Sequence, residues 1–418
     1  MKKKLVASLI SVAMVATLFA GCGSTQEAAP AAEETATSAA AEEEAPVAEE
    51  AVKEDAPAAA STSEAAEEAP AEEAAAPAGF DGLKANEAYD FPIIVKSFQS
   101  TYWQAALKGM DMAADELGVT YTAQGPNSES DIADQVNMLN SAITAAPVGI
   151  GLAACDTTSV LESLQDCADK GIPVVAFDTG VADAPEGSIV CTVATDNTAA
   201  GAEAAVNMYA AIKDVIADAE GQVRIGEINQ DATALNIQQR GLGFVNKMIE
   251  QLKADGKTVA VVGNEFYVNA AEGADAAEAV ADVIIEVAVP AQTTVEYCSN
   301  EAQVILSKPD TIAIFGSNQT AAEGVLAADA NLSLLGSDAA AGDVIGVGFD
   351  AGSTIKAAVE DGTFLGAVTQ SPLMMGYYAL YALTAAANGD TLEDVPTAGY
   401  WYDAANMNDD NIAPNLYD

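Results

Sequence analysis

From residue 91 to residue 401 the chain alternates short apolar segments with longer segments whose apolar residues recur at helical spacing. The short segments, such as residues 91–96 (FPIIVK) and 173–177 (PVVAF), are rich in β-branched residues, which is typical of buried strands. Strands that are apolar on both faces need helices over both faces, so the pattern predicts an α/β fold with parallel sheets. About ten strands in about 340 residues favour two doubly wound lobes over a single sheet.

The expected strands are residues 91–96, 119–122, 148–152, 173–177, 189–194, 223–228, 258–262, 283–287, 311–315, 344–349, 365–369 and 397–401. The expected helices are residues 103–117, 131–145, 158–170, 199–216, 237–253, 293–306, 321–332, 354–359 and 374–387.

The charge of the chain excludes several classes of function. It carries 63 acidic against 16 basic side chains, a formal net charge of -47, and no histidine. A surface this negative repels phosphate, so nucleic acid is excluded as a partner and a neutral or cationic ligand is favoured. Without histidine there is no Ser-His or Cys-His catalytic pair, and most zinc sites are excluded. An enzyme would have to use carboxylates, Lys or Tyr.

The first 22 residues are predicted to be a lipoprotein export signal. Three lysines at positions 2–4 precede an uncharged stretch, residues 5–21, that ends in small residues before Cys22. The tetrapeptide FAGC that ends at Cys22 resembles the lipobox of bacterial lipoproteins, which implies acylation of this cysteine and cleavage before it. An uncleaved anchor, or a plain signal with an unrelated cysteine, is the alternative interpretation.

Residues 23–79 consist almost wholly of Ala, Glu, Pro, Ser and Thr and contain no aromatic residue. They hold fifteen acids and one base and little that could be buried, which predicts a disordered acidic tether. Such a tether would hold a folded domain away from a membrane. Without the tether (-14) and the signal lysines (+3), residues 80–418 still carry a net charge of -36.

Five expected strands are followed by a polar side chain, namely Asp178, Asn229, Asn318, Asp350 and Gln370. In parallel sheets the carboxyl ends of the strands meet at one edge, where ligands bind. Carboxylates and amides, with no cation among them, hydrogen-bond hydroxyl groups, so these residues predict a crevice for a polar ligand. Singly, each could be a helix cap or turn residue instead, although Gln is a poor cap.

Aromatic pairs lie beside the same predicted edge. Tyr102 and Trp103 open the first helix, and Phe266 with Tyr267 follows the strand at 258–262. Flat rings can cover the C–H face of a sugar, whereas an anchor in the core is the alternative role. Residues 270–281 are expected to form an inserted loop at the rim of the crevice.

Several motifs together resemble the type I periplasmic solute-binding proteins of bacterial ABC transporters, in the ribose- and galactose-binding branch. The resemblance covers nearly all of residues 90–403. Its carriers are GIPVVAFD ending at Asp178, TDN ending at Asn197, RGLGF starting at Arg240, GFD ending at Asp350, and TQ ending at Gln370.

The resemblance implies two lobes joined by three crossovers, near residues 194–197, 370–372 and 396–400. The implied lobes are residues 80–195 plus 371–398, and residues 196–370 plus 399–418. Members of the family close over one ligand like a flytrap and present the closed form to a permease.

The family also implies site residues. Asp178, Asn318, Asp350 and Gln370 match positions that hydrogen-bond the sugar in ribose-binding members, and Tyr102 and Trp103 match stacking phenylalanines. Thr179 and Gln238 stand where the family has sugar-binding arginines, and Ser100 stands where it has an asparagine, which argues against ribose in the same pose. The full predicted set is Ser100, Tyr102, Trp103, Asp178, Thr179, Asn229, Gln238, Phe266, Asn318, Asp350 and Gln370.

No cofactor or metal is predicted. The segment that starts at Gly346 (GVGFDA) formally fits a dinucleotide fingerprint, but no later strand ends in the acid that would bind a ribose. Besides Cys22 the chain has four cysteines, Cys155, Cys167, Cys191 and Cys298, and no CxxC pair. Cys155 and Cys167 could be paired in an exported protein, and buried free thiols are the alternative.

We therefore expect an exported, lipid-anchored solute-binding protein of an ABC importer that captures a small neutral sugar or polyol and has no catalytic activity. Its partners would be permease subunits, with the membrane contacted only through the anchor, and the protein would be a monomer. The alternative is a ligand-sensing module that feeds a chemosensory or two-component receptor. A sugar-cleaving enzyme with Asp178 and Asp350 as an acid–base pair comes third.

Overall fold

The computed structural model describes residue 80 and residues 82–418 of the chain. The predicted export signal, the predicted lipidation site Cys22 and the predicted tether lie outside the described residues. Within the described range, no helix is both long and apolar enough to cross a bilayer.

The first lobe is built on a six-stranded sheet whose paired neighbours are all parallel, in the order β13-β5-β4-β3-β1-β2. Its strands are β1 (Asp90–Ile94), β2 (Thr120–Gln124), β3 (Ile150–Leu152), β4 (Val174–Phe177), β5 (Ile189–Thr195) and β13 (Val395–Thr397). Its helices are α1 (Thr101–Leu117), α2 (Ile132–Thr144), α3 (Leu161–Lys170) and α10 (Pro372–Asn388).

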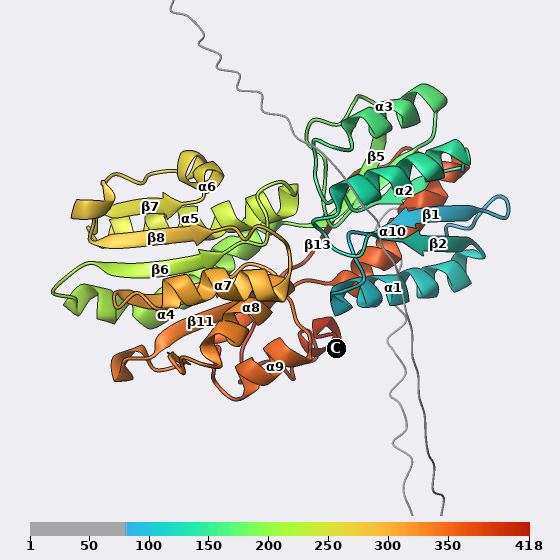
Figure 1. Ribbon diagram of the computed structural model, residues 1–418. Coiled ribbons are helices and arrows are strands. Elements are labelled where there is room, and N and C mark those ends of the chain that lie inside the picture. Colours follow the sequence, from blue (N-terminus) through green and yellow to red (C-terminus); the bar gives the residue numbers. More distant parts are fainter. Residues whose placement is uncertain (1–79, 81) are drawn as a thin grey trace, which may run out of the picture. The chain divides into compact units, whose positions relative to one another are not determined.

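Helices cover both faces of this sheet because alternate strand residues point to opposite sides. Phe91 and Ile93 pack in a cluster with residues of α1 and α10, whereas Ile94 packs in a second cluster with residues of α2 and α3. Figure 1 shows α1 and α2 beside β1 and β2, with α10 behind them.

The second lobe is built on an eight-stranded sheet in the order β14-β12-β11-β9-β6-β8-β7, with β10 paired to β11. Its strands are β6 (Val223–Ile228), β7 (Val259–Gly263), β8 (Val283–Ala288), β9 (Thr311–Gly316), β10 (Leu335–Gly336), β11 (Val344–Phe349), β12 (Gly366–Thr369) and β14 (Tyr400–Tyr402). Its helices are α4 (Asn197–Asp218), α5 (Leu235–Ala254), α6 (Glu265–Ala270), α7 (Val295–Leu306), α8 (Gln319–Asp329) and α9 (Ser353–Glu360). Short 3-10 helices lie at Glu278–Val280, Ala339–Ala341 and Ala413–Asn415.

This sheet is also covered on both faces. Ile225 and Phe315 pack in a cluster with residues of α4 and α5, whereas Ile228 and Ile314 pack in a cluster with residues of α7, α8 and α9. The predicted fold class is therefore confirmed: two lobes with parallel sheets, each covered by helices on both faces.

The chain passes between the two sheets three times, as the resemblance implied. It crosses from β5 to α4, from β12 to α10, and from β13 to β14. The prediction of one strand over residues 397–401 was wrong, because these residues span the third crossover. β13 pairs parallel to β5, whereas β14 pairs antiparallel to β12 in the other sheet. The lobe boundaries given above stay a prediction.

Two glycines allow helices α1 and α10 to approach each other at backbone distance. A methyl group on Gly109 would lie 1.8 Å from the carbonyl oxygen of Leu373, and one on Gly376 would lie 1.9 Å from that of Ala106. Side chains cannot be accommodated at such distances, so only glycine permits this packing. The contact fixes α1, whose first turn carries Tyr102 and Trp103.

Candidate functional site

The candidate site begins at the carboxyl ends of strands in both sheets. Asp178 follows β4 and Asp350 follows β11, and both adopt left-handed backbone angles, with φ of 60° and 71°. Asp is one of the few residues besides Gly that enter this region readily, which explains why both strands can end in the same sharp turn. Both aspartates are buried.

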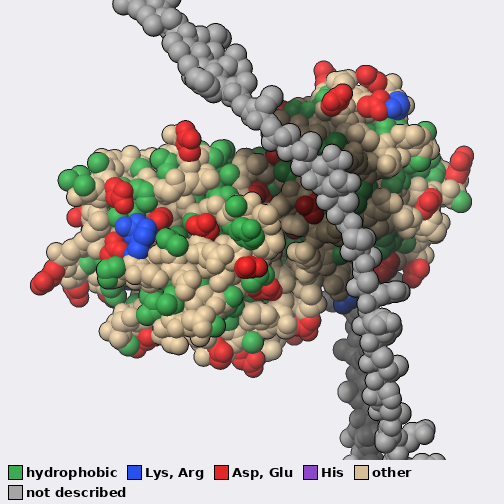
Figure 2. Space-filling model, in the orientation of Figure 1, with side chains coloured by type: hydrophobic (Ala, Val, Ile, Leu, Met, Phe, Trp, Pro, Cys, Tyr) green, Lys and Arg blue, Asp and Glu red, His purple; other side chains and the backbone are tan. Residues whose placement is uncertain are grey.

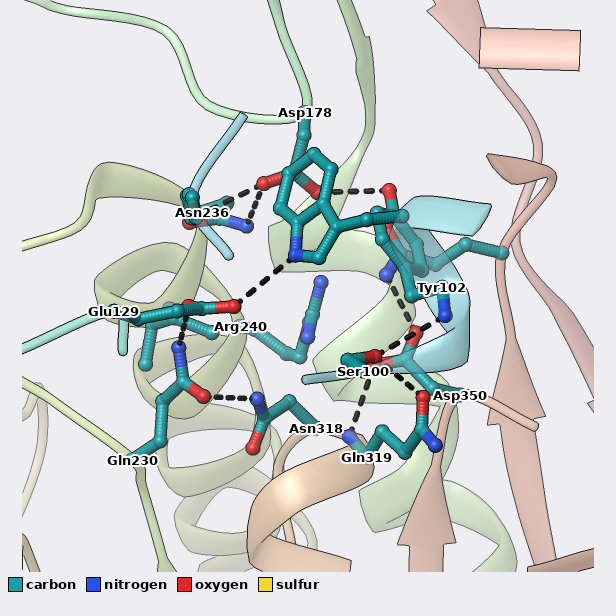
Figure 3. A pocket seen from close by; sticks show the side chains of 14 residues that line it. Ser100, Tyr102, Glu129, Asp178, Gln230, Asn236, Arg240, Asn318, Gln319 and Asp350 are labelled. Carbon is teal, nitrogen blue, oxygen red and sulfur yellow. Dashed lines mark hydrogen bonds and ion pairs between the residues drawn. The ribbon is translucent and has the colours of Figure 1, made fainter. Parts of the chain in front are cut away.

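Side chains from the two lobes meet around one cavity (Figure 3). The lining residues of the first lobe are Lys96, Ser100, Tyr102, Trp103, Glu129 and Asp178. Those of the second lobe and its crossover are Gln230, Asn236, Ile237, Arg240, Asn318, Gln319, Asp350 and Gln370. The free volume is about 30 Å³, room for roughly two water molecules, because the side chains bridge the lobes directly.

An ion pair lies at one side of the cavity. The Lys96 ammonium is 3.0 Å from Asp178 Oδ2 and donates to Asn236 Oδ1 at 3.0 Å. Asn236 Nδ2 also donates to Asp178 Oδ2, at 3.0 Å, so α5 of the second lobe bonds to both ions of the first. Burial opposes both charges, but the attraction between them prevails, so the pKa of Asp178 is lowered and that of Lys96 is raised.

A second bridge runs through Glu129. This carboxylate accepts from Trp103 Nε1 at 3.2 Å and from Gln230 Nε2 of the second lobe at 2.6 Å, and Asn318 in turn donates to Gln230 (Figure 3). Burial raises the pKa of Glu129, although Lys96 and the two donors partly offset this. A buried carboxylate with spare acceptor capacity suits a hydroxyl donor.

The third bridge is centred on Gln319. Ser100 Oγ donates to Gln319 Oε1 at 2.6 Å, and the Gln319 backbone N–H donates to Asp350 Oδ2 at 3.0 Å. Asp350 Oδ1 accepts from Gln370 Nε2 at 2.7 Å, at the crossover between β12 and α10. Burial raises the pKa of Asp350, with Arg240 and the Gln370 bond opposing that shift.

Arg240, at the wall of the cavity, is hydrogen-bonded within the second lobe. Its side chain is 1% exposed, and its Nη2 donates to Asn197 Oδ1 at 2.7 Å. Nη1 donates to the carbonyl oxygen of Ser317 at 2.8 Å, and the guanidinium lies 3.7 Å from the ring centre of Phe349. Because Asn197 directly follows the first crossover, Arg240 connects helix α5 to that crossover.

Seven predicted site residues come together in this cavity: Ser100, Tyr102, Trp103, Asp178, Asn318, Asp350 and Gln370. The two aromatic residues are also anchors, because Tyr102 is 5% and Trp103 2% exposed. The Tyr102 hydroxyl donates to Asp178 Oδ1 at 2.8 Å, and the Trp103 ring packs edge-on against Phe177. The two predicted roles of this aromatic pair, covering a ligand and anchoring the core, are therefore compatible.

Four predicted residues do not line the cavity. Thr179 is buried and donates to Asp178, so it supports the site from behind. Asn229 is fully buried and donates to Glu227 at 2.6 Å. Gln238 donates to the backbone of Ala232.

Phe266 is the fourth residue that lies outside the cavity. It sits on the short helix α6 and packs edge-on against Tyr267, with ring centres 5.0 Å apart. The expected rim loop, residues 270–281, does not line the cavity either; it is held against β7, where Asp275 accepts from the Val259 N–H.

Sequence reasoning missed seven lining residues: Lys96, Glu129, Gln230, Asn236, Ile237, Arg240 and Gln319. Two of these, Lys96 and Arg240, are cations, whereas the five polar residues that follow the expected strands include none. Four of the missed residues carried a signal. Lys96 ends an expected strand, Gln230 and Gln319 directly follow Asn229 and Asn318, and Arg240 opens one of the motifs that carry the resemblance.

The four cysteines of the described chain, Cys155, Cys167, Cys191 and Cys298, are free and buried. Of the two alternatives for Cys155 and Cys167, the structure therefore has the free thiols. Burial raises the pKa of Cys191 and of Cys298 to about 12, which keeps these thiols protonated and unreactive.

Glu227, beneath the site, gives a pH-dependent prediction. It is fully buried, and among the described residues its Oε2 and the Asn229 Oδ1 have no hydrogen-bond partner. Burial raises the pKa of Glu227 well above its ordinary value, so the folded protein holds a neutral carboxyl. The unfolded chain ionises first as pH rises, so the contribution of Glu227 is present below its unfolded pKa and is lost as pH rises toward the folded pKa.

We expect Glu227→Gln, which is neutral at every pH, to be more stable than the parent at pH 7. The difference should shrink by about 1.4 kcal/mol per pH unit as pH falls toward the unfolded pKa. Urea unfolding of both proteins between pH 4 and 8 measures it. A constant difference across that range would show that Glu227 is ionised in the folded protein.

Two lobes of parallel α/β structure, joined by three crossovers and bridged by polar side chains around one cavity, define the class of type I periplasmic solute-binding proteins. The chain belongs to this family, because residues 91–391 match the model of the periplasmic binding protein domain.

Solved structures with the same fold support this assignment. An ABC transporter protein of the LacI family of transcriptional regulators from Brachyspira murdochii is 28% identical, with a TM-score of 0.65 over 79% of this chain and 99% of its own. A solute-binding protein from Agrobacterium vitis with bound D-fucose is 25% identical, with a TM-score of 0.64 over 78% of this chain and 100% of its own. A carbohydrate transporter solute-binding protein from Agrobacterium radiobacter with D-arabinose is 25% identical, with a TM-score of 0.64 over 79% and 100%. No curated protein matches the chain.

Proposed function

We propose that this protein is the substrate-binding component of an ABC importer and captures a small neutral sugar or polyol between its two lobes. The observation that carries the proposal is the ring of carboxylates, amides and hydroxyls that both lobes direct into one cavity beside Trp103. Such groups bind the hydroxyls of a sugar, and binding to both lobes at once favours the closed state. The sugars in the related structures, D-fucose and D-arabinose, are of this class.

The charges of the cavity favour a neutral ligand. Lys96 is neutralised by Asp178 at 3.0 Å, and the donors of Arg240 are bonded to Asn197 and Ser317. Three carboxylates, those of Glu129, Asp178 and Asp350, line the cavity against these two basic side chains, so the lining offers an anion no net positive charge. The exterior adds to this, since acidic side chains are spread over the visible face of the molecule (Figure 2). A uronic acid or sugar phosphate would be repelled.

The export signal and the FAGC tetrapeptide support a location outside the cytoplasmic membrane, with Cys22 lipidated and residues 23–79 as the tether. We propose permease subunits as the protein partners, and a monomeric binding component. Cleavage before Cys22 and a lipid-sized mass on that residue, found by mass spectrometry of the protein from its host, would test the anchor.

Thermal unfolding with a panel of neutral sugars and polyols tests the proposed ligand class. A ligand at about 100 times its Kd adds about 2.7 kcal/mol of stability, so at least one should raise Tm by about 4 °C in a folded part of this size. The panel includes D-fucose and D-arabinose, with D-galacturonate and a sugar phosphate as anionic controls that should leave Tm unchanged. A flat response to every neutral compound at millimolar concentration contradicts the proposal.

A further inference from the structure

Not every contact between the lobes lines the cavity. Ser130, in the loop between β2 and α2 of the first lobe, meets Thr293, in the loop between β8 and α7 of the second. The Thr293 backbone N–H donates to Ser130 Oγ at 2.7 Å, and the two hydroxyl oxygens are 2.9 Å apart. Ser128 Oγ is 3.4 Å from Thr293 Oγ1. None of these three residues lines the cavity.

The first-lobe loop is braced independently of this contact. Ser128 N–H donates to Asp131 Oδ2 at 3.2 Å, and Asp131 N–H donates to the Ser128 carbonyl oxygen at 3.0 Å. Ser130 N–H donates to Ser128 Oγ at 3.3 Å. A preformed turn loses little conformational entropy when it docks, so hydrogen bonds made from it contribute more fully to closure.

The same turn positions a residue that does line the cavity. Glu129 lies between Ser128 and Ser130 and bonds to Trp103 and to Gln230. A ligand can exchange its own hydroxyls for those bonds, but it does not reach Ser130 or Thr293. The contact between Ser130 and Thr293 therefore persists in any closed state, whichever ligand is bound.

We propose that Ser130 and Thr293 form a clasp that holds the lobes closed without touching the ligand and thereby sets how long the ligand stays bound. The effect on residence time rests on the proposed function, whereas the effect on closure does not. Because the clasp exists only when the lobes are closed, its loss should raise koff and should not lower kon.

Ser130→Ala removes both bonds of the clasp. Loss of one or two neutral hydrogen bonds should destabilise the closed state by about three- to tenfold. Thr293→Val keeps the backbone donor and should have a smaller effect, and Thr293→Ser should behave like the parent. Ser141→Ala is the matched control, because Ser141 Oγ bonds only to the Asn137 carbonyl within α2.

Trp103 provides the readout in the full chain. It is one of two tryptophans, it lines the cavity, and it is 2% exposed in the closed state. In a Trp401→Phe background, acrylamide quenching without sugar reports opening, and stopped-flow fluorescence with D-fucose and D-arabinose gives kon and koff. We expect Ser130→Ala to increase quenching and to raise koff by about three- to tenfold, without lowering kon.

Unchanged quenching and koff in Ser130→Ala would overturn the clasp, and so would a fall in kon alone. If neither sugar changes the fluorescence of the parent, it is the sugar assignment that fails, and the quenching measurement decides the clasp by itself.

Discussion

Asp178→Asn is expected to be the most damaging single change in the site. Asn retains the shape and tolerates the left-handed backbone of this position, with φ of 60°, but it removes the charge that faces Lys96 at 3.0 Å. Lys96 is 2% exposed and would be left as a buried cation without its direct ion-pair partner. Breaking a buried pair on one side costs about 3–5 kcal/mol, and we expect the free energy of unfolding at pH 7 to fall by this amount.

A second substitution tests whether the unpaired charge of Lys96 causes this loss of stability. Lys96→Met in the Asp178→Asn background removes the unpaired ammonium and should restore most of the lost stability. It should not restore the sugar-induced rise in Tm, because the two groups that face the ligand are both gone. Urea unfolding of the parent, of Asp178→Asn, of Lys96→Met alone and of the double variant completes the cycle. If the double variant is no more stable than Asp178→Asn, the ion pair does not account for the loss.

The second large effect is expected for Arg240→Lys. Lysine keeps the charge but cannot donate to Asn197 and Ser317 at the same time, and it loses the stacking on Phe349. Two charge-assisted bonds are worth about 1.5–3 kcal/mol each, so we expect a loss of about 3 kcal/mol in unfolding free energy. Sugar affinity should fall as well, because Asn197 starts the helix that follows the first crossover.

Arg224→Lys is the matched control for this change. Arg224 is another buried arginine of the second lobe, 6% exposed, but at the start of β6 it pairs with two carboxylates, Glu286 at 2.6 Å and Asp310 at 3.2 Å, and it does not line the cavity. A lysine can keep one such ion pair, so we expect a smaller loss of stability and an unchanged sugar-induced shift. If both substitutions changed the sugar-induced rise in Tm equally, Arg240 would have no specific role in sugar binding.

The fold followed from the sequence because strand and helix periods are local properties. The apolar runs 344–349 and 223–228 were predicted with the bounds that the structure gives them. The resemblance placed the third crossover near residues 396–400, but the strand pattern predicted one strand over residues 397–401. Thr397, Tyr400 and Trp401 all favour strands and differ only in their partner strands. Pairing is a tertiary property that composition does not encode.

The candidate site was predicted where strand ends fix the side chains. Asp178, Asp350 and Asn318 follow strands and line the cavity. Asn229 also follows a strand, but it is buried toward Glu227, and its neighbour Gln230 takes the place at the cavity. A shift of one residue in the turn would exchange the positions of Asn229 and Gln230, and residue propensities do not determine which of the two faces the cavity.

The residues that came from loops and helix faces could not be found in this way. Glu129 reaches the cavity from a loop, and Asn236 and Arg240 reach it from the same face of α5, four residues apart. Their role depends on how the two lobes meet. Lys96 was not predicted as a site residue, because a lysine at the end of a strand is usually exposed to solvent.

Native mass spectrometry of the full chain purified from its own host tests the central claim most directly. The claim predicts one added mass equal to that of a single neutral sugar or polyol. After exchange against an excess of the ligand that raises Tm, the mass of that ligand should replace it. It also predicts that Asp350→Asn, which alters the carboxylate between Gln319 and Gln370, carries no such mass. Equal occupancy of the parent and of this variant by the same compound would contradict the account, because the ligand would then lie outside the cavity between the lobes.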